Sequence, residues 1–218
     1  MKAIIVAAGR GTRMRHLTEK LPKPMLVVAG KNLIEHKLDI LPPEIDEVVI
    51  VVGYQGEVIK SYFGNSYKGR KITYVEEPTL QGTGYAVYSS KEHLKDGRFL
   101  YMMGDDLYHK EDLAEALSHP WSMVVIKKQS PHAGGRVHLN ADGTVREIVE
   151  GTHDDGELLI NIGLFVAGKE FFNYDLVKLP GRNEYGFPQQ FALAAKDFPV
   201  NVVISKGWKP ITSPEDLV

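Results

Sequence analysis

Short apolar runs alternate with stretches of helical periodicity through the first half of the chain, and this alternation constrains the fold more than any other feature. The runs are continuously apolar, which is typical of parallel strands covered on both faces. The expected strands are Ala3–Ala8, Val48–Val52, Ile72–Val75, Phe99–Met103 and Met123–Ile126. The expected helices are Asn32–Ile40, Glu57–Phe63, Gly84–Leu94 and Lys110–Leu117. This order predicts a doubly wound α/β sheet, whose ligands bind beyond the carboxyl ends of the strands.

The pattern changes after about Gly134. Short antiparallel strands are expected at Arg136–Asn140, Thr144–Glu150 and Leu158–Val166, with turns at Asp142-Gly143 and Asp155-Gly156. Helices at Lys169–Leu179 and Phe187–Ala195 and a strand at Val200–Ser205 follow. The sequence therefore predicts one Rossmann-like domain over residues 1–218, mostly parallel, with a small antiparallel lobe.

Composition excludes several classes of function. The net charge of −2 gives no electrostatic footprint for nucleic acid or an anionic membrane, so any phosphate-binding charge is local. No cysteine occurs, which rules out a disulfide, a thiol nucleophile and a cysteine zinc site. The eight histidines are scattered without ligand spacing and are assigned no role. No apolar stretch is long enough for a signal segment or a membrane span, so a cytoplasmic location is expected.

The first expected strand runs into Gly9-Arg10-Gly11-Thr12-Arg13, and Lys23 follows between two prolines. Glycines let backbone N–H groups approach phosphate oxygens, and a triphosphate needs such a density of cations. A dinucleotide fingerprint would have a third glycine where Met14 stands, and the Gly-Lys-Ser/Thr ending of a Walker loop is absent. The remaining alternative is a tight turn with solvated arginines.

The segments AAGRGTRM and PKPMLVVAGKNLIEH resemble the N-terminal signature of the sugar-phosphate nucleotidyltransferase family. The resemblance implies that the loop after the first strand contacts the base and the phosphates. It also implies that an arginine and a lysine bind phosphates and carry the chemistry. The nucleotide-binding residues implied in this loop are Ala8, Gly9, Gly11 and Thr12, and the catalytic ones are Arg13 and Lys23.

Two further segments match the family. Glu77-Pro-Thr-Leu-Gln-Gly82-Thr83-Gly84 resembles its second signature, which implies that Glu77, Gly82 and Thr83 bind the nucleotide. A helix N-cap at Thr83 is the alternative, and it is compatible with nucleotide binding. Met103-Gly104-Asp105-Asp106 resembles the family's metal-binding Gly-Asp, which implies that Asp105 is catalytic and holds Mg²⁺; a plain turn is the alternative.

The second half of the chain resembles the family's sugar-binding lobe, and the matching positions are Gly135, Glu150 and Asn161. Residues 1–130 would then bind mainly the nucleotide, and residues 131–218 would form mainly the sugar-binding and C-terminal part. The activity implied is Mg²⁺-dependent transfer of a nucleoside monophosphate from a nucleoside triphosphate to a sugar 1-phosphate, with release of pyrophosphate.

Three positions depart from the family pattern. Pro210 stands where the family has its second metal carboxylate, and Asp106 or water could replace that ligand. Gly151 stands where many members have a phosphate-binding lysine, and Glu77 replaces a usual glutamine. The C-terminal wording also resembles cytidylyltransferases. Two alternatives therefore stay open: a cytidylyltransferase for a polyol or amino-alcohol phosphate, and a catalytically weakened nucleotide-binding homologue. Among nucleoside triphosphates, a pyrimidine is favoured over a purine.

Overall fold

The computed structural model describes residues 1–217. Most of its strands belong to one large sheet, and four two-residue strands form small ladders with their neighbours. The strands, in chain order, are β1 (Lys2–Ala7), β2 (Val27–Val28), β3 (Lys31–Asn32), β4 (Glu47–Val52), β5 (Ser66–Tyr67), β6 (Arg70–Glu76), β7 (Phe99–Met103), β8 (Asp106–Leu107), β9 (Ser122–Gln129), β10 (His132–Leu139), β11 (Val145–His153), β12 (Glu157–Ala167), β13 (Asn201–Ile204) and β14 (Lys209–Pro210).

The helices are short, and several are single 3₁₀ turns. The α-helices are α1 (Leu33–Ile40), α2 (Gly56–Phe63), α3 (Thr83–Ser89), α4 (Lys91–Leu94), α5 (Lys110–Leu117) and α6 (Phe187–Ala194), and the 3₁₀ segments are η1 (Thr12–Thr18), η2 (Lys23–Met25), η3 (Lys169–Asn173) and η4 (Pro214–Leu217). Within residues 1–217, none of these helices has the length and apolar character that a membrane crossing requires.

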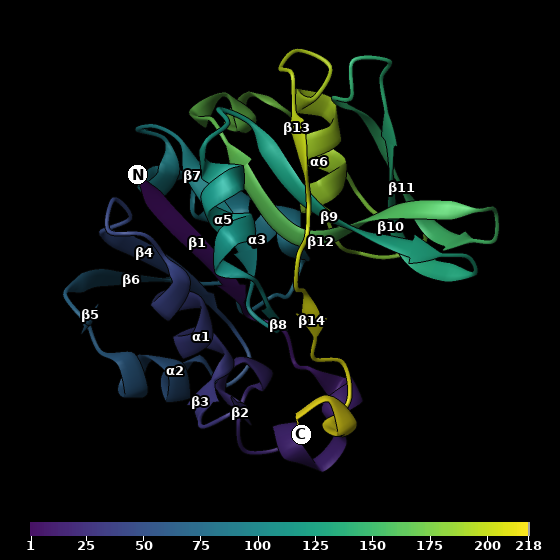
Figure 1. Cartoon of the computed structure of the whole chain (residues 1–218). Coiled ribbons are helices and arrows are strands. Elements are labelled where there is room, and N and C mark those ends of the chain that lie inside the picture. Colours follow the sequence, from purple (N-terminus) through teal and green to yellow (C-terminus); the bar gives the residue numbers. More distant parts are fainter. Residues whose placement is uncertain (218) are drawn as a thin grey trace.

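The large sheet has ten strands, in the order β11-β10-β12-β7-β1-β4-β6-β5; β9 pairs with β12, and β13 pairs with β9. β1, β4, β6 and β7 are parallel, whereas β12 runs antiparallel to β7 and β9. The expected antiparallel lobe is therefore an extension of the main sheet (Figure 1). Strand order reverses at β1, between β4 and β7, and this switch point is where ligands of such sheets bind.

Both faces of the sheet are covered, as the continuous apolar runs predict. One apolar cluster includes Ile34 of α1, Phe63 of α2 and Leu113 of α5. The other includes Val87 of α3 and Phe191 of α6, with a group of packed aromatic rings on β7, β12, η3 and α6. The stacked rings of Tyr101 and Phe187, with centroids 4.0 Å apart, join the central strand β7 to α6. The two helical layers hold the strand ends of the site in place.

The expected parallel strands and antiparallel strands are confirmed, but two helices differ from the sequence-based prediction. The helix expected over Lys169–Leu179 is wrong: η3 ends at Asn173, and Tyr174 is extended, with its carbonyl accepting a bond from Gln190. The helix expected over Gly84–Leu94 is interrupted at Ser90, whose hydroxyl donates to the carbonyl of Ala86. In both places a side-chain hydrogen bond competes with the helical pattern.

Candidate functional site

Three adjoining cavities of about 360, 830 and 200 Å³ open at the carboxyl ends of β1 and β7. Gly82 and Thr83 line both the 360 Å³ cavity and the 830 Å³ cavity. These two are called the nucleotide-side and sugar-side cavities, after the ligands that the sequence resemblance predicts for their residues. The nucleotide-side cavity gathers nine of the residues predicted from the sequence, namely Ala8, Gly9, Gly11, Thr12, Lys23, Glu77, Gly82, Thr83 and Asp105. Its walls also include apolar side chains such as Leu80 and Ala86, which suits the faces of a base.

Gly11 shapes the loop between β1 and η2. Its φ of +63° is a left-handed conformation, and a Cβ there would lie 2.7 Å from the Cβ of Lys23. The Thr18 hydroxyl donates to the carbonyls of Gly11 and Arg15, both at 3.2 Å, and so closes the loop on itself. Tyr54, just beyond β4, donates its hydroxyl to the carbonyl of Thr18 at 3.0 Å. The glycine-rich turn is therefore held by contacts within η1 and by one residue that follows β4.

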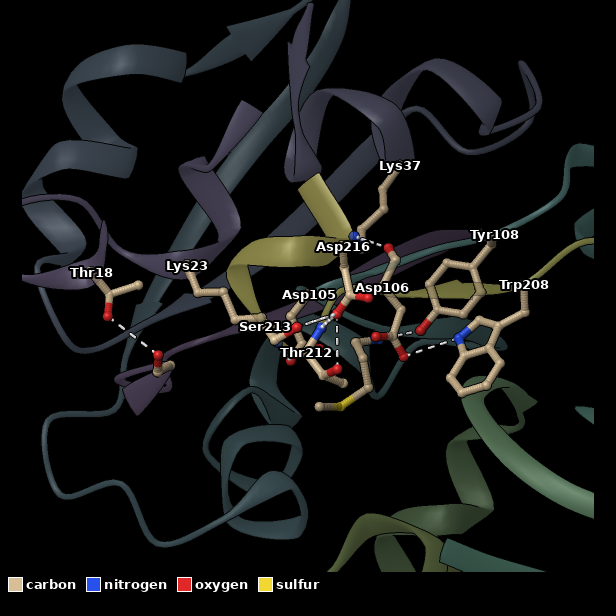
Figure 2. Close-up of polar contacts among 12 residues, drawn as sticks. Thr18, Lys23, Lys37, Asp105, Asp106, Tyr108, Trp208, Thr212, Ser213 and Asp216 are labelled. Carbon is tan, nitrogen blue, oxygen red and sulfur yellow. Dashed lines mark hydrogen bonds and ion pairs between the residues drawn. The ribbon is translucent and has the colours of Figure 1, made fainter. Parts of the chain in front are cut away.

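Lys23 and Asp105 form an ion pair at the strand ends. The lysine Nζ donates to the aspartate Oδ2 at 2.6 Å, and the two side chains are 6% and 27% exposed (Figure 2). Gly104 allows this approach, because its N–H donates to the Val6 carbonyl at 2.8 Å and a Cβ there would lie 2.6 Å from that oxygen. A carboxylate and an ammonium thus meet at the edge of the nucleotide-side cavity.

Arg13 lies at the junction of the cavities. It lines both the sugar-side cavity and the smallest cavity, which also borders Lys23 and Asp105. Within residues 1–217 its guanidinium has no hydrogen-bond or ion-pair partner. An unpaired guanidinium beside a glycine-rich loop is available to an anion.

Glu77 is 2% exposed, so its side chain is buried in the wall of the nucleotide-side cavity and does not face bulk solvent. Its Oε1 accepts bonds from the Thr79 hydroxyl at 2.5 Å and from the Gln81 N–H at 3.3 Å. Thr83 does not act as an N-cap: Gly82 precedes the first turn of α3, and the Thr83 hydroxyl accepts a bond from the Phe187 N–H at 3.0 Å. These contacts fix the wall of the nucleotide-side cavity to α6.

Gly82 is where a side chain should be least tolerated. Its φ is +93°, and a Cβ would lie 2.6 Å from the carbonyl oxygen of Tyr185. Backbone strain and the collision should together lower the free energy of unfolding of Gly82→Ala by at least about 2 kcal/mol, measured by denaturant titration. Gly156→Ala is the matched control, because Gly156 has φ +69° but nothing within 4 Å of a Cβ. Equal losses in the two variants would contradict the close packing of Gly82.

The sugar-side cavity brings together the three residues predicted for the second ligand. Gly135 and Glu150 pair across β10 and β11, and a Cβ on Gly135 would lie 2.8 Å from Glu150 Oε1 and 3.4 Å from Asn161 Nδ2. Gln189 of α6 donates to Glu150 Oε1 at 3.1 Å, and Asn161 Oδ1 accepts a bond from the Gly163 N–H at 2.8 Å. These are neutral and acidic hydrogen-bonding groups, which suit a polyhydroxyl ligand.

Pro210 lies directly beside the strand-end carboxylates. β14 pairs with β8, which places Pro210 opposite Asp106. The Asp106 carboxylate accepts a bond from Trp208 Nε1 at 3.1 Å and lines the sugar-side cavity (Figure 2). Asp105, by contrast, lines the other two cavities. The two neighbouring aspartates therefore face different parts of the site.

The electrostatics of these strand ends are shaped by burial. Burial raises the pKa of the Asp106 carboxyl above its ordinary value, and the neighbouring Asp105 carboxylate adds to the increase. Burial also lowers the pKa of the Lys37 ammonium on α1, although Asp105 and Asp106 partly oppose that decrease. Two carboxylates and two buried lysines (Lys23 and Lys37) thus lie close together at these strand ends.

Sequence reasoning missed several residues that the fold brings to the site. Thr212 lines the smallest cavity with Arg13, and Asp216 holds it there by accepting bonds from the N–H groups of Thr212 and Ser213 at 2.7 and 2.8 Å. These bonds lower the pKa of Asp216 to about 2. Arg182 lines the sugar-side cavity from a loop before α6, and its guanidinium has no partner within the described chain. Only the threonine lay in a segment with a recognisable signal.

The fold is a mostly parallel α/β sheet, and two adjoining cavities, one of them lined by many polar side chains, lie at its switch point. The chain belongs to the nucleotidyl transferase family, whose model matches residues 2–209. It is 31% identical to the bifunctional protein GlmU of Methanocaldococcus jannaschii over 100% of this chain and 53% of that protein. It is also 28% identical to the UTP–glucose-1-phosphate uridylyltransferase AglF of Haloferax volcanii, over 99% of this chain and 93% of AglF. The chain thus spans about half the length of the GlmU relative.

Solved structures share the fold. A putative glucose-1-phosphate thymidylyltransferase from Bacillus anthracis, in complex with a sucrose, superposes with a TM-score of 0.83 at 19% identity and covers 100% of this chain and 92% of its own. HddC from Yersinia pseudotuberculosis, complexed with GMP-PN, superposes with a TM-score of 0.71 at 22% identity, over 99% and 96% of the two chains.

Proposed function

We propose that this chain transfers a nucleoside monophosphate from a nucleoside triphosphate to a sugar 1-phosphate and releases pyrophosphate. The observation that carries the proposal is the smallest cavity, which is lined by Lys23 and Asp105 from the nucleotide-side cavity and by Arg13 from the sugar-side cavity. A nucleotide in the nucleotide-side cavity and a sugar phosphate in the sugar-side cavity would bring their phosphates together at this third cavity. Membership of the family supports this assignment of substrates.

The reaction needs positioning and charge neutralisation more than proton transfer. An oxygen of the sugar phosphate attacks the α-phosphorus, and the bond from the α-phosphorus to the pyrophosphate oxygen breaks. A phosphate monoester is already ionised near pH 7, so no general base is required. Arg13 would stabilise charge on the leaving pyrophosphate, and Lys23 would hold the α-phosphoryl oxygens. Ala8, Gly9, Gly11 and Thr12 would approach the nucleotide through their backbone.

The strand-end carboxylate fits a Mg²⁺ ion. Mg²⁺ in such enzymes takes one or two protein carboxylates and completes its shell with substrate phosphates and water. Asp105 is partly exposed and borders the nucleotide-side cavity, so it can supply one oxygen ligand. Pro210 has no side-chain ligand, and Asp106 faces the sugar-side cavity. We therefore assign the metal to Asp105, where it would neutralise phosphate charge.

A pyrophosphate-release assay across the four nucleoside triphosphates and a panel of sugar 1-phosphates tests the proposal. We expect release that requires both a triphosphate and a sugar 1-phosphate, and that stops when the divalent metal is chelated. Polyol and amino-alcohol phosphates belong in the same panel, because activity only with them would favour the cytidylyltransferase alternative. A protein that binds the triphosphate without release under any pairing would be the catalytically weakened homologue.

Glu77 is proposed as the base reader, and its second carboxylate oxygen has no partner within residues 1–217. A carboxylate accepts from the amino group of cytosine but repels a ring carbonyl of uracil. Glu77→Gln should therefore shift the CTP-to-UTP preference towards UTP by about 1–3 kcal/mol, measured by competition between the two nucleotides.

Glu76→Gln is the matched control for this comparison. Glu76 is the neighbouring carboxylate on β6, but it is 68% exposed and paired with Lys60. The preference should stay at the wild-type value in Glu76→Gln. If Glu77→Gln also leaves the preference unchanged, Glu77 does not read the base, and the proposed preference for a pyrimidine loses its support.

A further inference from the structure

Lys37 places an ammonium group behind the strand-end carboxylates. It lies on α1 among Leu33, Ile34 and Leu38, on the face that packs on the core, and its exposure is 0%. Its Nζ donates to the main-chain carbonyl of Asp106 at 2.5 Å and to that of Leu33 at 3.1 Å. The ammonium contacts neither the nucleotide-side nor the sugar-side cavity.

The carbonyl that Lys37 holds belongs to the residue directly after Asp105. Trp208 binds the side chain of the same residue, because its Nε1 donates to the Asp106 carboxylate at 3.1 Å. Figure 2 shows Lys37 reaching the backbone of Asp106 and Trp208 beside its carboxylate. The turn that carries Asp105 out of β7 is therefore fixed from α1 and from the segment before β14.

A buried ammonium group contributes little to the free energy of unfolding of a protein. Its desolvation is costly, and replacing buried charges by apolar groups of similar volume is often neutral or stabilising. Here the charge is compensated by two carbonyls, by the Tyr108 ring at 5.8 Å, and by the carboxylates of Asp105 and Asp106 nearby. Helix α1 already has a capping box at Asn32 and apolar neighbours that attach it to the core. What the Lys37 ammonium adds is a hydrogen bond from α1 to the turn, through the carbonyl of Asp106.

We propose that Lys37, together with Trp208, is a positioning residue that holds the Asp105 carboxylate in the orientation needed for a divalent cation and the triphosphate. The proposal rests on the proposed function and adds to it a residue that touches no substrate. If Lys37 holds Asp105 in place, its removal should weaken cation binding, whereas a purely electrostatic role predicts the opposite. Removing a positive charge beside two carboxylates would then strengthen cation binding.

Lys37→Met tests this difference, because methionine has a similar shape but neither charge nor donor. The measurement is the Mn²⁺ affinity of the complex with an α,β-methylene nucleoside triphosphate, followed by water-proton relaxation and corrected for Mn²⁺ on the analogue alone. We expect about 10-fold weaker Mn²⁺ binding, the usual effect of losing a residue that orients a metal ligand. We also expect a lower kcat with the KM for the triphosphate within about twofold of wild type. Unchanged or tighter Mn²⁺ binding would overturn the proposal.

Lys60→Met is the matched control, since Lys60 is a helical lysine on α2 paired with Glu57 and Glu76 at the surface. It should bind Mn²⁺ as the wild type does. If Lys37→Met does not fold, Trp208→Phe replaces it, because this change removes the other contact with Asp106. Mn²⁺ binding must weaken there too, and an unchanged affinity would overturn the proposal. Absence of turnover in the wild-type protein would instead count against the proposed function.

Discussion

Asp105→Asn should lower kcat by about 10³-fold while the protein stays folded. Asparagine keeps an oxygen to which Lys23 can donate, so the buried ammonium retains a partner. The substitution removes the negative charge that would hold the cation between the phosphates. Steady-state kinetics at saturating substrates and Mg²⁺ measure the loss, and circular dichroism checks the fold.

Asp39→Asn is the matched control, because Asp39 is also paired with lysines, Lys31 at 2.5 Å and Lys68 at 2.6 Å. It lies on α1 away from the cavities and should keep the wild-type kcat. Wild-type turnover by Asp105→Asn at saturating Mg²⁺ would show that Asp105 is not the metal ligand.

Arg13→Ala should weaken binding of the triphosphate by about 1.5–3 kcal/mol, the usual contribution of a hydrogen bond to a charged group. Since the Arg13 side chain has no polar partner within the described chain, its removal breaks no hydrogen bond or ion pair of the fold. The loss should therefore appear in ligand binding and leave the free energy of unfolding nearly unchanged.

Calorimetry with the triphosphate and with the nucleoside alone separates a phosphate contact from a general distortion. Only the triphosphate should lose affinity in Arg13→Ala. Arg146→Ala, which removes an arginine paired with Glu147 at the surface, should change neither affinity. Equal losses for the triphosphate and the nucleoside would mean that Arg13 does not contact phosphate.

The strands could be predicted from the sequence because a strand buried on both faces is a continuous run of apolar residues. Phe99–Met103 became β7 with the same bounds, and Lys110–Leu117 became α5. The local sequence pattern does not indicate which strands pair with one another. β12 lies in the middle of the sheet against β7 and β9, so the antiparallel strands extend the main sheet. The wrong helix over Lys169–Leu179 has a related cause, because Tyr174 is fixed by a bond from Gln190, a residue of α6.

The candidate site divides in the same way. Residues in long signatures, such as Gly11, Lys23 and Asp105, could be named from the sequence, and the fold brings them to one cavity. Arg182 and Thr212 come from segments whose position depends on tertiary contacts. The importance of Lys37 could have been predicted from the helical pattern of the sequence. This residue stands at a core-facing position of α1, four residues after Leu33, where a lysine needs a buried partner.

The most direct test of the account follows the α-phosphorus. The triphosphate that performs best in the pyrophosphate assay is labelled at its α-phosphate with ³²P and incubated with a sugar 1-phosphate and Mg²⁺. We predict that the label appears in a nucleoside diphosphate sugar, in step with unlabelled pyrophosphate, and that neither product forms without the sugar phosphate. Label that remains in the triphosphate, or that appears as free nucleoside monophosphate whether or not the sugar phosphate is present, would contradict the proposed transfer.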